Sequence, residues 1–303
     1  MTNTTLPVSI VDAHVHLWDP GQERIPWLAG NALLNRRYDV TTYQEHTAST
    51  VIGRMVYVQV DVVPADAFRE MDWVLAQAAE DPRLGAIVAW APLEDGDGVR
   101  AHLRNLRALD PRVVGVRRNI QSEPDPAFCL RPGFVQGVHL LAEYGLSCDL
   151  CLTHHQLPSA IALARQCPET TFILDHLGKP AIAAGRLDPW REHLAALAAL
   201  PNAACKVSGV VTEANHGQWT IDDLAPYVAH ALAVFGEDRV LFGGDWPVVL
   251  LASSYQRWVE TLHELTTHLS VDARRRLWAD NARRLYRLPN EENSKDIVAS
   301  RRP

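Results

Sequence analysis

The sequence has little of what marks a membrane, secreted or nucleic-acid-binding protein. It contains no apolar run near the roughly 18 residues that span a bilayer, and its start, MTNTTLPVSI, lacks the charged and apolar regions of a secretory signal. Its net charge is −7, from 29 basic and 36 acidic residues, with no basic cluster suited to binding phosphates. We therefore expect a cytoplasmic protein with neither a nucleic-acid nor a membrane partner.

Cysteine and the common catalytic signatures are scarce as well. The five cysteines are odd in number, and Cys148-x-x-Cys151, a spacing seen in redox and zinc pairs, lies in the strand-like run SCDLCL without a second such pair. We expect buried, unpaired thiols. A Gly-rich phosphate loop, a dinucleotide fingerprint and a G-x-S-x-G elbow are absent, so we expect no nucleotide or organic cofactor and no serine nucleophile.

Short apolar segments rich in Val and Ile alternate with longer amphipathic segments along the chain. Such continuous apolar runs are typical of parallel strands covered on both faces. Eight of them in about 290 residues predict an α/β protein with a (β/α)8 TIM barrel rather than an open doubly wound sheet. The expected strands are Ile10–Ala13, Met55–Val60, Gly85–Trp90, Val113–Arg117, Cys148–Leu152, Thr171–Leu174, Ala204–Val207 and Val240–Phe242. The expected helices are Ala65–Glu80, Val99–Leu109, Phe134–Tyr144, Leu157–Gln166, Trp190–Ala199, Asp223–Phe235, Ser254–Leu269 and one more that begins after Ser270.

The chain is expected to form one domain, because no change in composition divides residues 1–290. The long connection 19–53 after the first strand is expected to add loop or helix elements, as a lid, over one end of the barrel. The tail, residues 291–303, is polar and without periodicity, so we expect it to be disordered. The sequence leaves the oligomeric state open, a homo-oligomer included.

Polar, titratable residues follow nearly every expected strand, always at the same end. The C-terminal ends of barrel strands meet in one mouth, so these side chains are expected to converge. His14 and His16 end the first strand, where a period of two turns both to the same side. A lone strand-end His or Asp is more often structural, but six strands share the pattern. The other strand-end groups are Gln59, Arg117, Arg118, His154, His155, Asp175, His176, Lys179, Lys206, Ser208 and Asp245.

These residue types support attack of water on a carbonyl group. His14 and His16, with Asp245 and a histidine of the fifth or sixth strand, form a nitrogen and oxygen set that suits Zn²⁺ with an open coordination position. Alternatively, Asp245 accepts the proton of the attacking water directly while histidines polarise the carbonyl. Positive charge for a carboxylate, a hydroxyl or an oxyanion comes from Arg117, Lys179 and Lys206.

Tryptophans lie beside these polar groups in the sequence. Trp18, Trp27 and Trp246 are suited either to stacking on a sugar ring or to packing as a lid. We assign Trp27 and Trp246, together with Gln59, to the substrate-binding residues.

Five stretches resemble one known family. They are DAHVHLWDP, LTHHQLP, LDHLGKP, CKVSGVVTEA and LFGGDWPVVLLASSY, spread between Val11 and Leu288. Together they resemble the amidohydrolase-related TIM-barrel metal-dependent hydrolases. Within these they are most similar to the sugar-lactonase group, which includes L-fuconolactonase, L-rhamnonolactonase and galactonolactonase, with 2-pyrone-4,6-dicarboxylate lactonase as a relative.

The resemblance implies roles for the matching residues. Asp245, His155 and His176 correspond to catalytic residues, with the aspartate activating water while histidines and cationic residues stabilise the oxyanion. His14, His16, Asp245 and His176 correspond to the metal-binding positions. The carbamylated lysine of binuclear relatives is absent, since strand four ends in GVRRN. Members of the group differ in their need for metal, so we expect at most one divalent cation, zinc first.

The predicted function is hydrolysis of a sugar-acid (aldono) 1,4- or 1,5-lactone, such as L-fucono-, L-rhamnono- or galactonolactone, by an Asp-activated water. The alternative is a metal-dependent decarboxylase of an unsaturated or aromatic carboxylic acid, because that group also begins with HxH and ends with Asp. The third is a non-catalytic barrel that binds a sugar acid. The expected partner is thus a small molecule, and the surroundings HLWD and HLGKP favour the lactonase.

Overall fold

The computed structural model describes residues 9–288, and within them eight parallel strands lie side by side in the order of the chain. This confirms the predicted (β/α)8 barrel. The tail predicted to be disordered lies outside the described residues. The strands are β1 Ile10–Val15, β2 Ile52–Val58, β3 Leu84–Ala89, β4 Val113–Arg117, β5 Ser147–Leu150, β6 Phe172–Leu174, β7 Ala203–Val207 and β8 Val240–Phe242.

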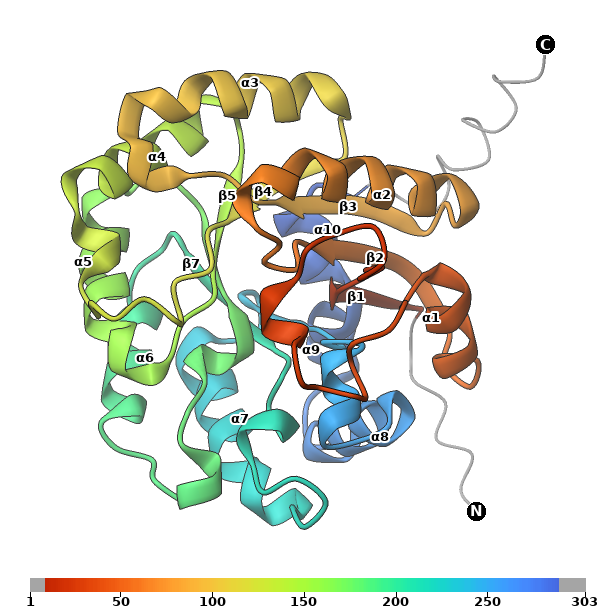
Figure 1. Cartoon of the computed structure of the whole chain (residues 1–303). Coiled ribbons are helices and arrows are strands. Elements are labelled where there is room, and N and C mark those ends of the chain that lie inside the picture. The colour runs from red at the N-terminus through yellow and green to blue at the C-terminus, as the bar shows by residue number, and fades with distance from the viewer. Residues whose placement is uncertain (1–8, 289–303) are drawn as a thin grey trace.

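Helices surround the strands (Figure 1). The expected helix after Ser270 is divided by a π-helical turn over Arg276–Asp280, and the helix expected over Ser254–Leu269 ends four residues earlier. Some helices begin at a capping side chain: that of Ser254, for example, accepts a hydrogen bond from the Arg257 amide at the start of α8. The helices are α1 Val40–His46, α2 Ala67–Glu80, α3 Arg100–Leu109, α4 Pro132–Glu143, α5 Leu157–Gln166, α6 Trp190–Ala198, α7 Ile221–Phe235, α8 Tyr255–Leu265, α9 Val271–Arg275 and α10 Asn281–Leu285.

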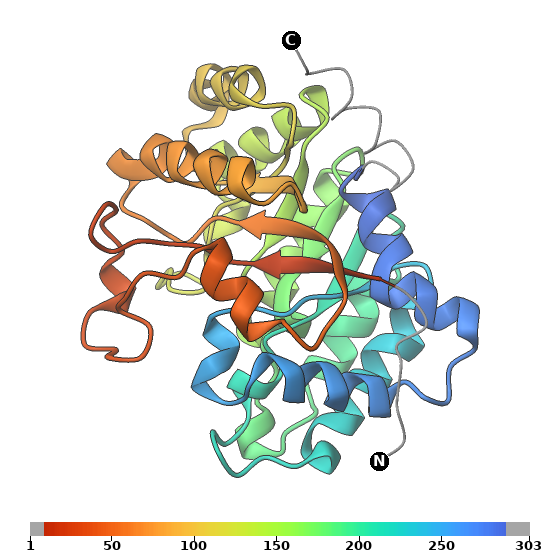
Figure 2. The same cartoon turned by 90° about the vertical axis from the view of Figure 1, so that its right-hand side faces the viewer.

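Apolar side chains form much of the inside of the barrel, and the C-terminal helix covers its lower end, where the strands begin. Small and branched side chains of the strands form this inner cluster, and Tyr286 and Ala282 complete it from below. Figure 2 shows the C-terminal helices at the end where the strands begin, and the loop that precedes α1 in segment 19–53 at the end to which the strand arrows point. The mouth of the barrel therefore lies on the side of this loop.

The barrel closes between β8 and β1 at the predicted site residues themselves. The His16 amide donates to the Trp246 carbonyl and the Asp245 amide donates to the His14 carbonyl, both over 2.8 Å. Closure thus brings the first and last strand ends into direct contact. None of the helices within residues 9–288 combines the length and apolar character needed to cross a membrane.

Strand β1 does not keep a strict alternation of sides. Asp12 faces outward, where the hydroxyls of Tyr43 and Tyr255 donate to its carboxylate, whereas His14 faces Lys206 inside the barrel. A period of two would turn Asp12 and His14 the same way. The pairing of β1 with β2 shifts register between Asp12 and Val15, which separates the two side chains.

Gly243 offers a test of how tightly this closure is packed. A Cβ on Gly243 would lie 2.8 Å from the Cβ of His14 and 2.9 Å from the Cβ of Ser208, closer than real contacts. We expect Gly243→Ala to lower the free energy of unfolding by about 1–3 kcal/mol in urea titrations. Gly98→Ala is the matched control, because its Cβ would meet only Asp95 at 3.5 Å. Equal stability of the two variants would contradict the tight closure.

Candidate active site

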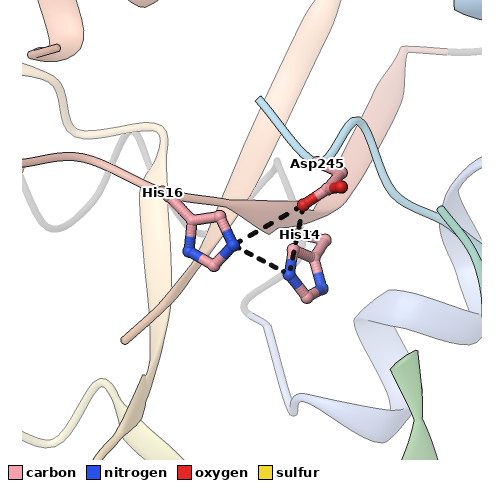
Figure 3. A group of neighbouring side chains, drawn as sticks. All are labelled: His14, His16 and Asp245. Carbon is pink, nitrogen blue, oxygen red and sulfur yellow. Dashed lines mark hydrogen bonds and ion pairs between the residues drawn. The ribbon is translucent and has the colours of Figure 1, made fainter. Parts of the chain in front are cut away.

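Three predicted ligands meet where the barrel closes (Figure 3). The Nε2 atoms of His14 and His16 lie 3.1 Å apart, and they lie 3.7 Å and 3.6 Å from Oδ1 of Asp245. All three side chains are buried. Asp245 has a φ of 53°, a left-handed conformation that non-glycine residues adopt at a cost and that gathers at functional sites.

Contacts on the far side of each ring hold the two imidazoles. Nδ1 of His16 lies 2.7 Å from the Val58 carbonyl, and Nδ1 of His14 lies 3.3 Å from Oδ1 of Asp175 and 3.3 Å from the Lys206 ammonium. Because a carbonyl only accepts, Nδ1 carries the proton in the neutral ring of His16. The Nε2 lone pair of His16 is thereby available to the space that Asp245 faces.

The three atoms fit a zinc ion. Two ligands that each lie about 2.1 Å from one tetrahedral zinc are about 3.4 Å apart, close to the 3.1, 3.6 and 3.7 Å found here. Two imidazole nitrogens and one carboxylate oxygen are also the donors that zinc takes in hydrolytic sites. His14, His16 and Asp245 can therefore hold one divalent ion.

His176, the fourth predicted ligand, lies beside this cluster. Its ring centroid is 4.5 Å from that of His14, and its Nδ1 lies 2.9 Å from the Ser208 hydroxyl. It belongs to a left-handed turn in which His176, Leu177 and Lys179 have φ of 54°, 54° and 49°. This turn costs backbone energy and presents both His176 and Lys179 to the same pocket.

Burial sets the protonation of the cluster. It lowers the pKa of His16, it lowers that of His14 well below the ordinary value, and it lowers that of His176 to about 4, so the imidazoles are neutral at pH 7. Burial alone would raise the pKa of Asp245, but the neighbouring His176 and His16 hold it below its ordinary value. Asp245 is therefore an ionised carboxylate among neutral imidazoles.

A pocket opens above the cluster and contains three of the predicted substrate-binding residues. Arg117 places Nη1 3.2 Å from Asp175 and 3.5 Å from Nε2 of His14. Trp27, from segment 19–53, is 41% exposed and donates its indole hydrogen to the Val60 carbonyl over 2.7 Å. Further lining residues are His16, Asp61, Asn119, Gln121, Ser122, Cys151, His176, Lys179, Thr212 and Asp245.

Comparison with known proteins decides the family. A family model described as "Amidohydrolase" matches residues 11–288. The chain belongs to the amidohydrolase family. An L-fucono-1,5-lactonase of Burkholderia multivorans is 33% identical over 307 residues, which cover 94% of this chain and 98% of that protein.

Solved structures of similar proteins have the same fold. The crystal structure of a Burkholderia multivorans amidohydrolase with bound zinc is 31% identical, with a TM-score of 0.84, over 93% of this chain and all of that one. A probable 2-pyrone-4,6-dicarboxylic acid hydrolase of Acinetobacter baumannii, with citric acid bound, matches 93% of this chain and all of its own at a TM-score of 0.76. It is 16% identical and therefore shows the shared fold alone.

Two residues predicted to bind substrate lie behind the pocket of this amidohydrolase. The side chain of Lys206, in β7, points into the barrel below the histidines and is fully buried. Its Nζ lies 2.7 Å from Asp149 and 2.9 Å from Asp175. Gln59 is also fully buried, where it accepts from the Asp61 amide and donates to the Arg117 carbonyl over 3.3 Å. Both hold the site rather than face the pocket.

Trp246 and His155, which were also predicted to belong to the site, lie outside the pocket lining. Trp246 is fully buried between the rings of Tyr38 and Tyr43, with centroids 5.2 and 5.3 Å away, so it packs under segment 19–53 instead of lining the pocket. His155 is exposed and stacks on His154 at 3.9 Å. The structure does not bring His155 to the cluster, since the turn that begins at Thr153 directs it outward.

Sequence reasoning missed Asp149, which supports the cluster from below together with the predicted strand-end residue Asp175. Asp149 accepts a hydrogen bond of 2.6 Å from the Tyr286 hydroxyl and pairs with Lys206. A single acid in the apolar run SCDLCL is a signal for such a pair, because a buried carboxylate needs a partner. Asp61 and Asn119, which line the pocket, follow strands by two or three residues and carried no such signal.

The Lys206 ammonium also fills the second place where a cation would fit. His14, Asp175 and His176 form another group with metal-ligand spacing. Lys206 lies 2.9 Å from the Asp175 carboxylate and 3.3 Å from Nδ1 of His14, so its ammonium already contacts two members of this group. Within residues 9–288, this leaves one open metal-ligating cluster at the mouth.

Lys206 should therefore contribute far more to stability than the lysine at the mouth. Lys206→Met leaves Asp149 and Asp175 buried without their cation, which costs about 3–5 kcal/mol and should lower the unfolding midpoint by about 10 °C. Lys179→Met is the matched control, because Lys179 pairs with Glu213 at 3.7 Å in a partly exposed place. Calorimetry that gave both variants the same midpoint would contradict this assignment.

Proposed function

We propose that this amidohydrolase opens a sugar-acid lactone with water. The observation that carries the proposal is the position of the Asp245 carboxylate, which lies beside the imidazoles of His14 and His16 and lines a pocket that Trp27 and Arg117 also line. A carboxylate in that position is within reach of a water molecule in the pocket and can accept its proton. The lactonase that is 33% identical supports a sugar lactone, and an aldono 1,4- or 1,5-lactone such as L-fuconolactone, as the substrate class.

The residues divide the reaction between them. Asp245 takes a proton from the water whose oxygen attacks the lactone carbonyl, and a hydrogen bond donated by the His176 imidazole stabilises the oxyanion that forms. The bond between the carbonyl carbon and the ring oxygen then breaks. Asp245 returns the proton to that ring oxygen, which leaves a hydroxyl and a carboxylic acid in the open chain. His176 lies close enough to the same pocket to donate a hydrogen bond to the substrate.

A divalent ion would bind at the cluster where the barrel closes. His14, His16 and Oδ1 of Asp245 would hold one divalent ion, zinc first, and Oδ2 of Asp245 would remain for the proton. Such an ion supplies a Lewis acid and lowers the pKa of water. Trp27 offers a flat apolar face to a sugar ring, while Asn119, Gln121 and Ser122 offer hydrogen bonds to hydroxyl groups.

A panel of aldonolactones tests the function. We expect the wild type to release acid from at least one of them, and Asp245→Asn to lower kcat by about 10²- to 10⁴-fold, because the proton acceptor is lost. Asp188→Asn, at an exposed ion pair with Arg191, should keep the wild-type rate.

An inactive wild type or an unimpaired Asp245→Asn would overturn the proposal. Carbon dioxide release from aromatic or unsaturated acids, without lactone turnover, would favour the decarboxylase alternative.

Metal content gives an independent readout. We expect one zinc per chain by elemental analysis after dialysis against zinc-containing buffer, and a loss of that zinc in His16→Ala, because the variant lacks one of three ligands. His139→Ala removes an exposed histidine of α4 and should retain the ion. Equal zinc in both variants would place the ion elsewhere. Full activity of a metal-free wild type would leave the chemistry to Asp245 without an ion.

A further inference from the structure

The charged side chains that line the pocket differ in whether they already have a partner of opposite charge. Both cations that line it already have a carboxylate partner: Arg117 pairs with Asp175 at 3.2 Å, and Lys179 pairs with Glu213 at 3.7 Å. Asp245 belongs to the histidine cluster. Neither cation is therefore free to meet a second anion without losing part of its present interaction.

Asp61 is the exception among these charges. Its carboxylate lines the pocket and accepts one hydrogen bond, from the Asn119 amide over 3.2 Å, and within residues 9–288 it has no ion-pair partner. Its backbone has a φ of 59°, held by donation of its amide hydrogen to Oε1 of Gln59. A non-glycine residue kept in this strained conformation by a buried side chain is a feature of functional positions.

The neighbours of Asp61 are suited to hydroxyl groups. Asn119, Gln121 and Ser122 follow β4, and Asp61 follows β2, so these polar groups share one side of the mouth. A carboxylate with a free oxygen accepts charge-assisted hydrogen bonds from hydroxyls. The same carboxylate repels an anionic substituent that approaches it.

We propose that Asp61 determines specificity: its carboxylate binds hydroxyls of an uncharged, polyhydroxylated lactone and rejects lactones that carry a carboxylate or sulfonate there. This rests on the proposed lactonase function and adds the charge class of the substrate. Attraction requires that the hydroxyls donate to the free oxygen of Asp61. Rejection follows because no cation of the lining is unpaired to offset a second negative charge.

Two lactones that differ in one group test the proposal. Galactono-1,4-lactone ends in a neutral CH₂OH, and galactaro-1,4-lactone ends in a carboxylate on the same ring. We expect the wild type to prefer the neutral lactone in kcat/KM. Asp61→Asn should lower kcat/KM for the neutral lactone and narrow the preference by about tenfold or more, because both the charged acceptor and the repulsion are lost.

A nearby acid serves as the control. Glu123 pairs with Arg118 at 2.7 Å, and its carboxylate lies outside the pocket lining, so Glu123→Gln should keep the wild-type preference. A wild type that prefers the carboxylate-bearing lactone, or an unchanged preference in a folded Asp61→Asn, overturns this inference and leaves the lactonase function standing. A wild type that opens neither these two lactones nor any other overturns the proposed function, and this inference with it.

Discussion

The ion pairs of Lys206 inside the barrel support the rest of the site. The ammonium lies between Asp149 and Asp175, and Tyr286 reaches Asp149 from the helix that covers the lower end. Asp175, held in this way, orients the imidazole of His14 and pairs with Arg117 at the mouth. One buried cation thus connects the floor of the barrel to the groups that face the pocket, and its charge favours the ionised forms of both carboxylates against the cost of their burial.

Local strain is concentrated in the same region. Asp245 and the turn from His176 to Lys179 adopt left-handed conformations, and so does Asp61 across the mouth. Such conformations persist only where the surrounding packing favours them strongly. Trp246 supplies part of that packing between Tyr38 and Tyr43, which explains why the tryptophan next to Asp245 is a structural residue here.

The strands and the convergence of their ends followed from the sequence because both depend on local patterns. Apolar runs mark buried parallel strands, and the barrel geometry then brings His14, His16 and Asp245 together whatever lies between them. Depth within the barrel has no such pattern: Lys206 also stands near a strand end, and only its register decides that it points below the histidines. The outward position of His155 likewise depends on the turn after Thr153, and that of Asp12 on a register shift in β1.

The closure of β8 on β1 has a consequence for how the protein matures. Asp12 and Gly244, which are hydrogen-bonded across this junction, are 232 residues apart in the chain. During synthesis the two histidines leave the ribosome early, and their aspartate follows when most of the barrel has already been made. The cluster therefore needs both ends of the barrel, so a nascent or truncated chain that lacks β8 holds the two histidines without Asp245, and the complete set of three ligands reports that the whole barrel has been made.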